Sequence, residues 1–176
     1  MSIITRTGDN GETSLMYNRR VSKCHPRIEA CGCTDELTSF LGLARVTTSN
    51  PWVKEILFSI QQDLIVLMGE LATGVEDLPR YVMEGHRLIT PEMTEKLERI
   101  ANEVEQKLRP YHGWAIPGQT HVSAVLDIAR AVCRRAERRV CALHETGQLK
   151  NPEIIRFLNR LSDLLWLLAR LEEVAS

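Results

Sequence analysis

Residues 5–14, with the sequence TRTGDNGETS, combine two glycines, two acids and four hydroxyl side chains within ten positions. Backbone N–H groups in a glycine-containing loop can bind phosphate oxygens. The P-loop motif, however, is G-x-x-x-x-G-K-[ST], and no lysine follows Gly11 here. The segment therefore predicts a phosphate-binding loop whose positive charge comes from elsewhere in the chain.

A run rich in arginine, RAVCRRAERRVCAL, occupies residues 130–143. On a helical wheel with about 100° per residue, the apolar side chains of this segment fall on one stripe. The stripe consists of Leu126, Ala129, Cys133, Ala136 and Val140. Arg135 and Arg139 point away from the stripe, which is typical of a solvated helix face.

Arg130, Arg134 and Glu137 differ because they lie at the edge of the apolar stripe, where a bundle helix is partly buried or faces a neighbour. Unpaired buried charge is costly, so these side chains need partners. Two arginines and one glutamate leave one positive charge uncompensated. An anionic ligand or a partner chain could balance it, and guanidinium groups suit phosphate oxygens. A purely structural ion-pair network is the alternative interpretation.

The segment FLNRLSDLLWLLARL, residues 157–171, is apolar on nearly all sides, which predicts a central helix. One face nevertheless carries Asn159, Asp163, Trp166 and Arg170. A polar stripe on a central helix must be satisfied either by hydrogen bonds between helices or by a ligand. The sequence leaves both possibilities open.

Asp35 lies on a helix face made of small residues, which lets another helix approach closely. These neighbours are Cys31, Gly32, Ser39 and Gly42. An acid in such a groove needs a basic partner. Arg130 is the natural candidate, either in the same chain or in a second subunit.

Proline and glycine divide the chain into long helical segments. We expect an extended segment and loop over residues 1–24, and a further loop over residues 74–89. The predicted helices cover residues 26–46, 52–71, 90–110, 120–144 and 152–174. Long helices joined by short loops predict an all-α, antiparallel helical bundle in a single domain.

Composition excludes several classes of function. The 176 residues carry a net charge of -1, which argues against a protein that mainly neutralises nucleic acid or an anionic membrane. No segment resembles a signal peptide, and no apolar run is long enough to span a bilayer. The five cysteines form no C-x-x-C pair, which favours reduced thiols in the cytoplasm. The absence of Glu-x-x-His motifs and of zinc-like His and Cys groupings argues against a di-metal bundle and against any metal held by protein side chains.

Several motifs in this order resemble the PduO-type corrinoid (cob(I)alamin) adenosyltransferases. The matching segments are TRTGD-x-G-x-TS at 5–14, PRIEACGCTDELTSFLG at 26–42, IPG at 116–118, RAVCRRAERRV at 130–140 and FLNRLSDLLWLLAR at 157–170. The resemblance implies a five-helix bundle with one domain over residues 1–176. Residues 1–24 would then be a nucleotide-binding loop, and residues 26–174 the bundle.

The resemblance also implies an activity. Members of the family transfer the 5′-deoxyadenosyl group of ATP to the cobalt of cob(I)alamin and release triphosphate, with Mg²⁺ on the phosphates. It further implies a homotrimer with active sites between subunits. A cobalamin-reducing flavoprotein and a cobalamin-dependent mutase or dehydratase would be functional partners. The non-catalytic alternatives are a carrier or sensor that binds adenosylcobalamin and ATP, and a helical scaffold with structural ion pairs only.

Site residues follow from the resemblance position by position. The expected ATP-binding residues are Thr5, Arg6, Thr7, Gly8, Thr13, Ser14, Lys23, Arg134, Arg135, Glu137, Arg138 and Asn159, with the helical wheel favouring Arg134 and Glu137 over Arg135. The residues expected to carry catalysis are Arg134, Glu137, Arg130 and Asp35, the last two as an acid–arginine pair across the subunit interface. Trp114 and Trp166 are expected to contact the corrin.

Four features depart from the family pattern. Asn10 stands where a lysine is usual, Gln119 replaces a usual glycine, and Cys33 stands where threonine is common. MYN at 16–18 replaces a turn that is richer in glycine. We expect these changes to affect rate and affinity rather than the class of reaction.

Overall fold

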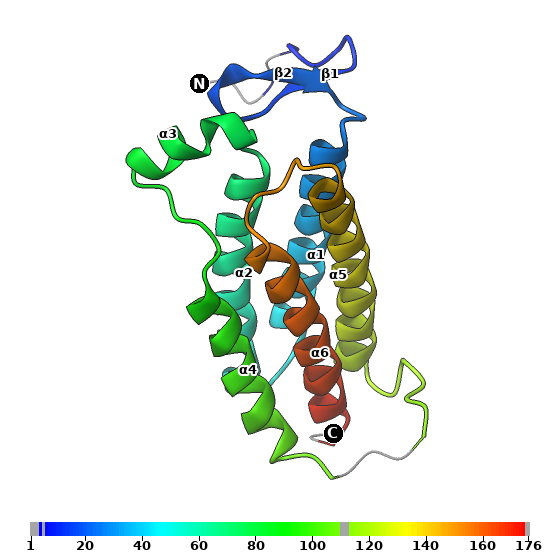
Figure 1. Ribbon diagram of the computed structural model, residues 1–176. Coiled ribbons are helices and arrows are strands. Elements are labelled where there is room, and N and C mark those ends of the chain that lie inside the picture. Colours follow the sequence, from blue (N-terminus) through cyan, green and yellow to red (C-terminus); the bar gives the residue numbers. More distant parts are fainter. Residues whose placement is uncertain (1–3, 5, 110–112, 175–176) are drawn as a thin grey trace.

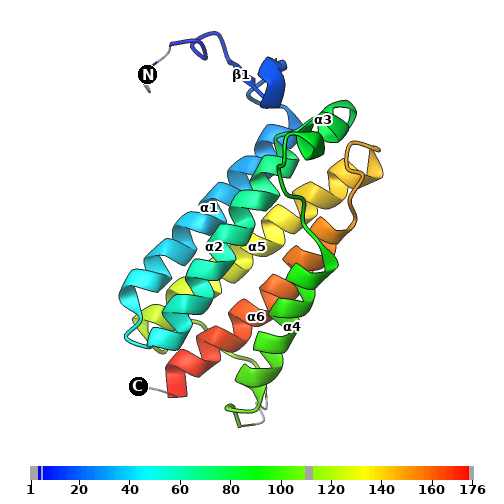
Figure 2. The same cartoon turned by 90° about the vertical axis from the view of Figure 1, so that its left-hand side faces the viewer.

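Long helices packed side by side form the body of the protein (Figures 1 and 2). The computed structural model describes residues 4, 6–109 and 113–174. The α-helices are α1 (Pro26–Thr47), α2 (Pro51–Leu71), α3 (Leu78–Met83), α4 (Pro91–Glu105), α5 (His121–Glu145) and α6 (Glu153–Val174). The predicted helical bundle is therefore confirmed, and each predicted helix has a counterpart.

Packing follows a different order from the sequence. Helix α1 packs against α2 and α5, and α6 packs against α5 and α4. The three contacts α1–α2, α1–α5 and α5–α6 are antiparallel, as predicted, but α4 and α6 run in the same direction (Figure 1). This parallel pair arises because α5 carries the chain back along the bundle between them.

Capping residues set the helix starts. Thr120 and Ser123 exchange hydrogen bonds of 3.0 Å between their side chains and backbone N–H groups, which forms a capping box at the start of α5. Asn151 accepts a hydrogen bond from the Glu153 N–H over 3.1 Å and starts α6. Both boundaries therefore lie within a residue or two of their predicted positions.

Helix α6 occupies the centre of the bundle, as its sequence predicts. Most of its apolar side chains are fully buried, including Phe157, Leu158, Leu161, Leu164, Leu165 and Leu168. Each such side chain contributes about 1.5–3 kcal/mol to folding. Because the core fixes α6 so firmly, its polar residues occupy defined positions.

The amino-terminal segment forms a small hairpin at one end of the bundle (Figure 1). Strands β1 (Glu12–Ser14) and β2 (Arg20–Ser22) pair antiparallel, with Ser14 opposite Arg20. A 3-10 turn, η1 (Met16–Asn18), connects them. The expected extended segment is thus present, but its pairing into a hairpin was not predicted.

The predicted loop over 74–89 was wrong in part, because it contains the turn η2 (Val75–Asp77) and the short helix α3. Six residues are too few to give a helical repeat in the sequence. Within the described part of the chain, no single helix is both long and apolar enough to cross a membrane. Pro51–Leu71 and Val75–Met83 meet that test only together, and they are bent by 103°.

Candidate active site

The glycine loop and Lys23 lie together beside the hairpin. Gly11 N–H donates to the Gly8 carbonyl over 3.2 Å, and Lys23 N–H donates to the Gly11 carbonyl over 2.9 Å. A Cβ atom added to Gly8 would lie 3.1 Å from Lys23 Nζ, so the ammonium group sits directly against the loop. A positive charge therefore stands beside the loop, although no lysine follows Gly11 in the sequence.

Arg20 joins the loop to the hairpin, and the sequence analysis missed it. Its guanidinium donates to the Thr7 carbonyl over 2.9 Å and to Ser14 Oγ over 3.3 Å, and lies 3.4 Å from Glu12 Oε2. The clue would have been the strand register, which places Arg20 opposite Ser14. Thr13 is half-buried and Ser14 exposed, Arg6 and Thr7 are exposed, and Thr5 lies outside the described residues.

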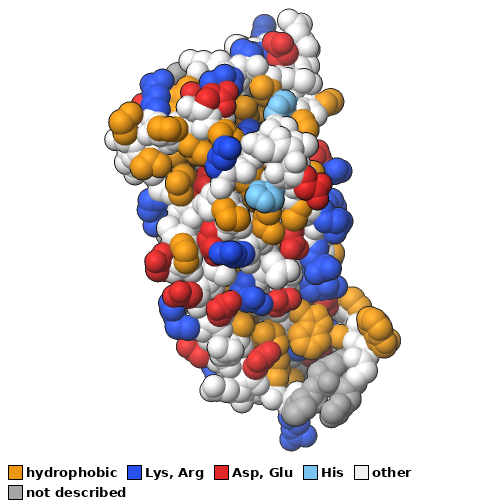
Figure 3. All heavy atoms as spheres, viewed as in Figure 1, with side chains coloured by type: hydrophobic (Ala, Val, Ile, Leu, Met, Phe, Trp, Pro, Cys, Tyr) orange, Lys and Arg blue, Asp and Glu red, His pale blue; other side chains and the backbone are white. Residues whose placement is uncertain are grey.

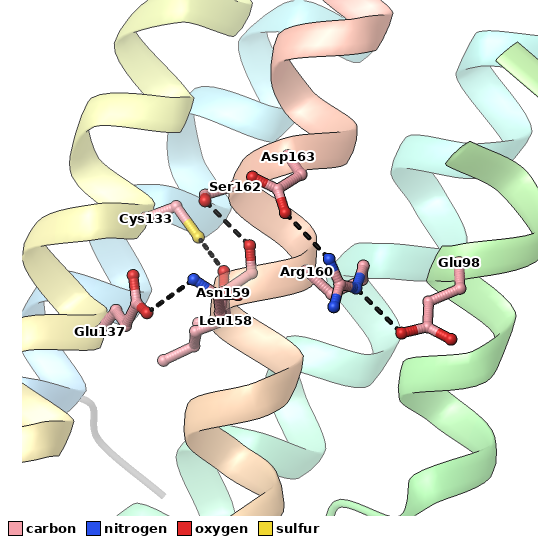
Figure 4. A network of polar contacts seen from close by, with 8 residues as sticks. All are labelled: Glu98, Cys133, Glu137, Leu158, Asn159, Arg160, Ser162 and Asp163. Carbon is pink, nitrogen blue, oxygen red and sulfur yellow. Dashed lines mark hydrogen bonds and ion pairs between the residues drawn. The ribbon is translucent and has the colours of Figure 1, made fainter. Parts of the chain in front are cut away.

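Glu137 and Asn159 meet on the face shared by α5 and α6 (Figure 4). Asn159 Nδ2 donates to Glu137 Oε1 over 3.2 Å. The backbone below is fixed by two further contacts: Ser162 Oγ donates to the Asn159 carbonyl, and Cys133 Sγ donates to the Leu158 carbonyl. The predicted polar stripe on α6 is therefore partly satisfied between helices, while Asn159 stays exposed.

On the outer side of Asn159, Arg160 forms a separate ion-pair network. It contacts Glu98 on α4 and Asp163 on its own helix, each over 3.0 Å (Figure 4). Asp163 is thus engaged with Arg160 rather than with the Glu137 cluster. The network ties α6 to α4 and is separate from the hydrogen bond between Asn159 and Glu137 on the α5 side.

Arg134 and Arg138 follow the same exposed edge of α5. Arg138 donates to the Arg134 backbone carbonyl over 3.0 Å, and neither guanidinium has a carboxylate partner among the described residues. The positive charge that the sequence left uncompensated is therefore also uncompensated in the structure. An anion placed here would meet two guanidinium groups that no carboxylate of the described residues neutralises.

Arg135 and Arg139 face α1 instead. Arg135 pairs with Glu36, and Arg139 Nε lies 3.4 Å from Glu29 Oε1. The two side chains are therefore not simply solvated, as the helical wheel predicted, but join α5 to α1. This arrangement agrees with the preference for Arg134 over Arg135 at the site.

Within the single chain, Arg130 does not pair with Asp35. Its Nε lies 3.6 Å from Asp127 Oδ1 one turn earlier on α5, and Asp127 also pairs with Arg170 over 2.5 Å. Asp35 is exposed on α1. The same-chain form of the predicted pair is thus absent from the described residues, and the form across a subunit interface stays a prediction.

Trp166 lies at the other end of the bundle from the hairpin. It is half-buried on α6 and lines a cavity of about 600 Å³ together with Leu108, Leu167 and Val174. Trp114 is 95% exposed on the connector before α5. Figure 3 shows hydrophobic side chains gathered over this end of α6 and the connector.

The loop and the tryptophans are far apart in one chain. The hairpin lies near the end of α5, whereas Trp114 precedes its first residue (Figure 1). A helix of 25 residues is about 37 Å long. The polar face with Arg134, Glu137 and Asn159 lies between these two ends.

Two of the thiols, those of Cys31 and Cys133, are poorly suited to nucleophilic chemistry. Burial raises the pKa of Cys31 to about 11 and raises that of Cys133 as well. Neither is therefore a thiolate at neutral pH. Among the described residues there is also no group of three or more His, Cys, Asp or Glu side chains that could hold a metal ion.

The described residues define a helical-bundle protein with a glycine loop at one end, a cavity lined by both apolar and charged side chains at the other, and between them an arginine edge without a carboxylate partner. A family model described as cobalamin adenosyltransferase matches residues 3–172, so the chain belongs to this family.

Two relatives show how much of the chain is shared. The corrinoid adenosyltransferase PduO of Salmonella typhimurium is 38% identical over 174 residues, which are 98% of this chain and 50% of that protein. A corrinoid adenosyltransferase of Citrobacter freundii is 38% identical over 171 residues, covering 97% of this chain and 94% of that protein. The chain therefore spans about half the length of the PduO relatives and nearly all of the shorter Citrobacter freundii protein.

A solved structure shares the fold. A variant PduO-type ATP:corrinoid adenosyltransferase from Lactobacillus reuteri, complexed with cobalamin and ATP, superposes with a TM-score of 0.90 at 28% identity. The match covers 98% of this chain and 91% of that chain. A bundle of this shape is thus able to bind both ligands in that relative.

Proposed function

We propose that the chain transfers the 5′-deoxyadenosyl group of ATP to the cobalt of cob(I)alamin, forming adenosylcobalamin and releasing triphosphate. The observation that carries this proposal is the edge of α5, where the unpaired Arg134 lies one turn from the hydrogen-bonded Glu137 and Asn159. Family membership and the relative complexed with cobalamin and ATP support the choice of these two substrates.

The reaction needs no nucleophile from the protein. Cobalt(I) supplies the electron pair that forms the cobalt–carbon bond, and the bond between the ribose 5′ carbon and the triphosphate oxygen breaks. Triphosphate leaves with that bond's electrons, and cobalt becomes cobalt(III). The raised pKa values of the Cys31 and Cys133 thiols fit a mechanism in which neither reacts.

The protein's tasks are then to orient ATP and to stabilise the departing charge. Lys23 beside Gly8 and the N–H groups of the loop are suited to the phosphates. Arg134 supplies a second positive charge, while Glu137 and Asn159 offer an acceptor and a donor for the nucleoside.

Mg²⁺ would be held mainly by triphosphate oxygens and water. Such ions usually take only one or two protein carboxylates. The exposed Asp9 in the glycine loop fits this requirement, whereas Glu12 lies beside the Arg20 guanidinium. When bound, the ion would neutralise charge on the triphosphate.

We further propose a homotrimer with active sites between subunits. The hairpin lies near the last turn of α5 and Trp114 precedes its first residue (Figure 1), so a helix about 37 Å long stands between the two halves of the predicted site within one chain. A neighbouring subunit could bring the halves together. It would also supply a basic partner for the exposed Asp35, for which Arg130 is the candidate.

The end of the bundle that carries Trp114 and Trp166 would exclude water and the lower axial ligand from cobalt. Trp166 borders a cavity in which its ring, Leu167 and Val174 supply apolar surface beside charged side chains, and the exposed Trp114 has a large apolar surface to cover. Removal of the lower ligand makes cobalt(II) easier to reduce, so a flavoprotein reductase would be a natural partner. The cytoplasm is the compartment that fits five free cysteines.

Anaerobic mixing with ATP, Mg²⁺ and chemically reduced cobalamin tests the proposal. Loss of the cobalt(I) absorbance with formation of a light-sensitive alkylcobalamin is expected. Tight binding without turnover would favour the carrier or sensor. A carrier would deliver adenosylcobalamin to a cobalamin-dependent mutase or dehydratase. Neither binding nor turnover would leave a structural scaffold. Sedimentation of the same sample tests the trimer.

A further inference from the structure

The turn between the two hairpin strands has an unusual backbone. Tyr17 has φ 60° and ψ 31°, and Asn18 has φ 56°. Both residues therefore lie in the left-handed region, which glycine adopts readily and a bulky side chain does not. This chain therefore places a tyrosine where the backbone disfavours a bulky side chain. Such a conformation persists only where the surroundings fix it.

The surroundings of Tyr17 come from α3. The Tyr17 hydroxyl donates to Glu84 Oε2 over 2.8 Å, and Arg80 Nε donates to Glu84 Oε1 over 2.8 Å. The Arg80 guanidinium also lies over the tyrosine ring, with Cζ 4.1 Å from the ring centroid. Three side chains thus form a closed set in which the tyrosine contributes both its ring and its hydroxyl, contacts that glycine could not make.

A second set of contacts fixes the next residues of the turn. Arg19 donates from Nε to Asp77 Oδ2 over 2.9 Å, and its NH1 lies 3.0 Å from Glu76 Oε1. The Met16 N–H donates to the Ala72 carbonyl at the end of α2 over 2.9 Å. Figures 1 and 2 show the hairpin above the end of the bundle near α3.

The same hairpin carries the glycine loop. Arg20 follows Arg19 directly and donates to the Thr7 carbonyl, and Lys23 at the end of β2 lies against Gly8. The position of the loop relative to the bundle therefore depends on how the turn is held.

We propose that Tyr17 and Arg19 are positioning residues that fix the ATP-binding loop on α3. We name the set Tyr17, Arg19, Asp77, Arg80 and Glu84 the α3 tether. The proposal rests on the proposed function, because it concerns the same nucleotide loop. By holding the loop before ATP arrives, the tether reduces the ordering cost of binding. None of its members needs to touch the nucleotide.

If these residues only stabilised the fold, their replacement would lower the melting temperature. The Arg19 and Arg80 pairs are exposed, and exposed ion pairs contribute little to global stability. The tether should therefore affect the order of the loop and the KM for ATP, but not kcat, the KM for cobalamin or the melting temperature.

Three variants test this. Tyr17→Phe removes only the hydroxyl bond, Arg19→Met removes the second contact, and Arg19→Lys keeps a charge. Loss of one such hydrogen bond changes the equilibrium between the ordered and the disordered loop about fivefold. We expect the KM for ATP to rise about fivefold in Tyr17→Phe and Arg19→Met, with unchanged kcat, and Arg19→Lys to recover part of the loss. Arg99→Met is the control, because its pair with Glu95 is also exposed and lies on α4, outside the tether.

Hydrogen exchange gives a readout that does not depend on activity. The amides of Met16 and Lys23 are hydrogen-bonded in the folded turn and should exchange about fivefold faster in the tether variants. Unchanged exchange and unchanged KM, or a parallel loss of kcat, would overturn the tether. If the wild-type protein does not turn over, the proposed function fails, while the exchange experiment still decides whether α3 holds the loop.

Discussion

Asn159 on α6 donates a hydrogen bond of 3.2 Å to Glu137 on α5, and this bond crosses the middle of the polar face (Figure 4). The two residues are 22 positions apart and are brought together because α5 and α6 pack antiparallel. The bond fixes the Glu137 carboxylate one turn from the unpaired Arg134. It thereby gives the proposed site an acceptor of defined orientation.

Replacing Asn159 tests the orientation of this carboxylate. Asn159→Ala leaves Glu137 without its donor, and we expect kcat/KM for ATP to fall about tenfold, as for the loss of a charged hydrogen bond. Asn159→Asp has the same shape but places a second carboxylate beside Glu137, so its loss should be larger. Steady-state kinetics decide between these outcomes. An Asn159→Asp protein as active as the wild type would remove the pair from the site.

Arg134 is the next residue to test, with Arg139 as a control on the same helix. We expect Arg134→Ala to lower kcat about 100-fold, the usual effect of removing one group that stabilises developing charge. Arg139→Ala removes an equally exposed guanidinium that pairs with Glu29, and should leave kcat within about twofold. Sedimentation should show the same oligomer in both variants. Equal losses in both would indicate a general effect of charge.

The helices and the central position of α6 were predictable because they depend on local signals. Thr120 and Asn151 mark helix starts through contacts two or three residues away. The polar faces of Arg134, Glu137 and Asn159 were also visible, since each lies on a regular helix whose periodicity places it.

Other features depend on which distant segments meet, and periodicity does not encode this. The wheel put Arg135 on a solvated face because it cannot show that Glu36, 99 positions away, lies opposite. Arg20 was missed because the hairpin register was unknown. The Asp127–Arg170 pair joins residues 43 positions apart, so the helical wheel of α5 alone could not show that Arg170 lies beside Asp127 and Arg130.

Trp114 provides a test at the cobalamin end. Its side chain is 95% exposed, so Trp114→Ala should change the free energy of unfolding by less than about 0.5 kcal/mol. If the ring covers the corrin, the KM for cobalamin should rise about tenfold, in line with the loss of a large apolar contact. Phe58→Ala, which removes an exposed aromatic side chain on α2, should leave that KM unchanged. An unchanged KM in Trp114→Ala would contradict the corrin contact.

Glu70 predicts a pH dependence of stability. It is 2% exposed, and burial raises the pKa of its carboxyl above the ordinary 4.5 despite a hydrogen bond from the Ile89 N–H. The folded protein therefore keeps this proton at pH values where the unfolded chain has released it. Consequently the free energy of unfolding falls as pH rises from 4.5 through the raised pKa.

Glu70→Gln should remove this contribution. The amide can still accept the Ile89 N–H, which the carboxylate does over 2.8 Å, but it does not ionise. Urea unfolding across this pH range should show a shallower decline for the variant, and a stability at neutral pH equal to or above that of the wild type. Identical pH profiles would show that Glu70 does not carry the effect.

The Asp127–Arg170 pair is the strongest candidate for a stabilising ion pair. The two side chains are 6% and 4% exposed and lie 2.5 Å apart, and Glu173 contacts the same guanidinium over 3.0 Å. Arg170→Met leaves the buried Asp127 carboxylate and the half-buried Glu173 carboxylate short of a partner, which should cost about 3–5 kcal/mol of unfolding free energy. Adding Asp127→Asn removes one of these charges and should recover part of the loss.

The control is Arg99→Met, which breaks an exposed pair and should change stability by less than about 1 kcal/mol. Urea midpoints measure all three, and an Arg170→Met protein as stable as Arg99→Met would mean that Arg130 alone can compensate Asp127.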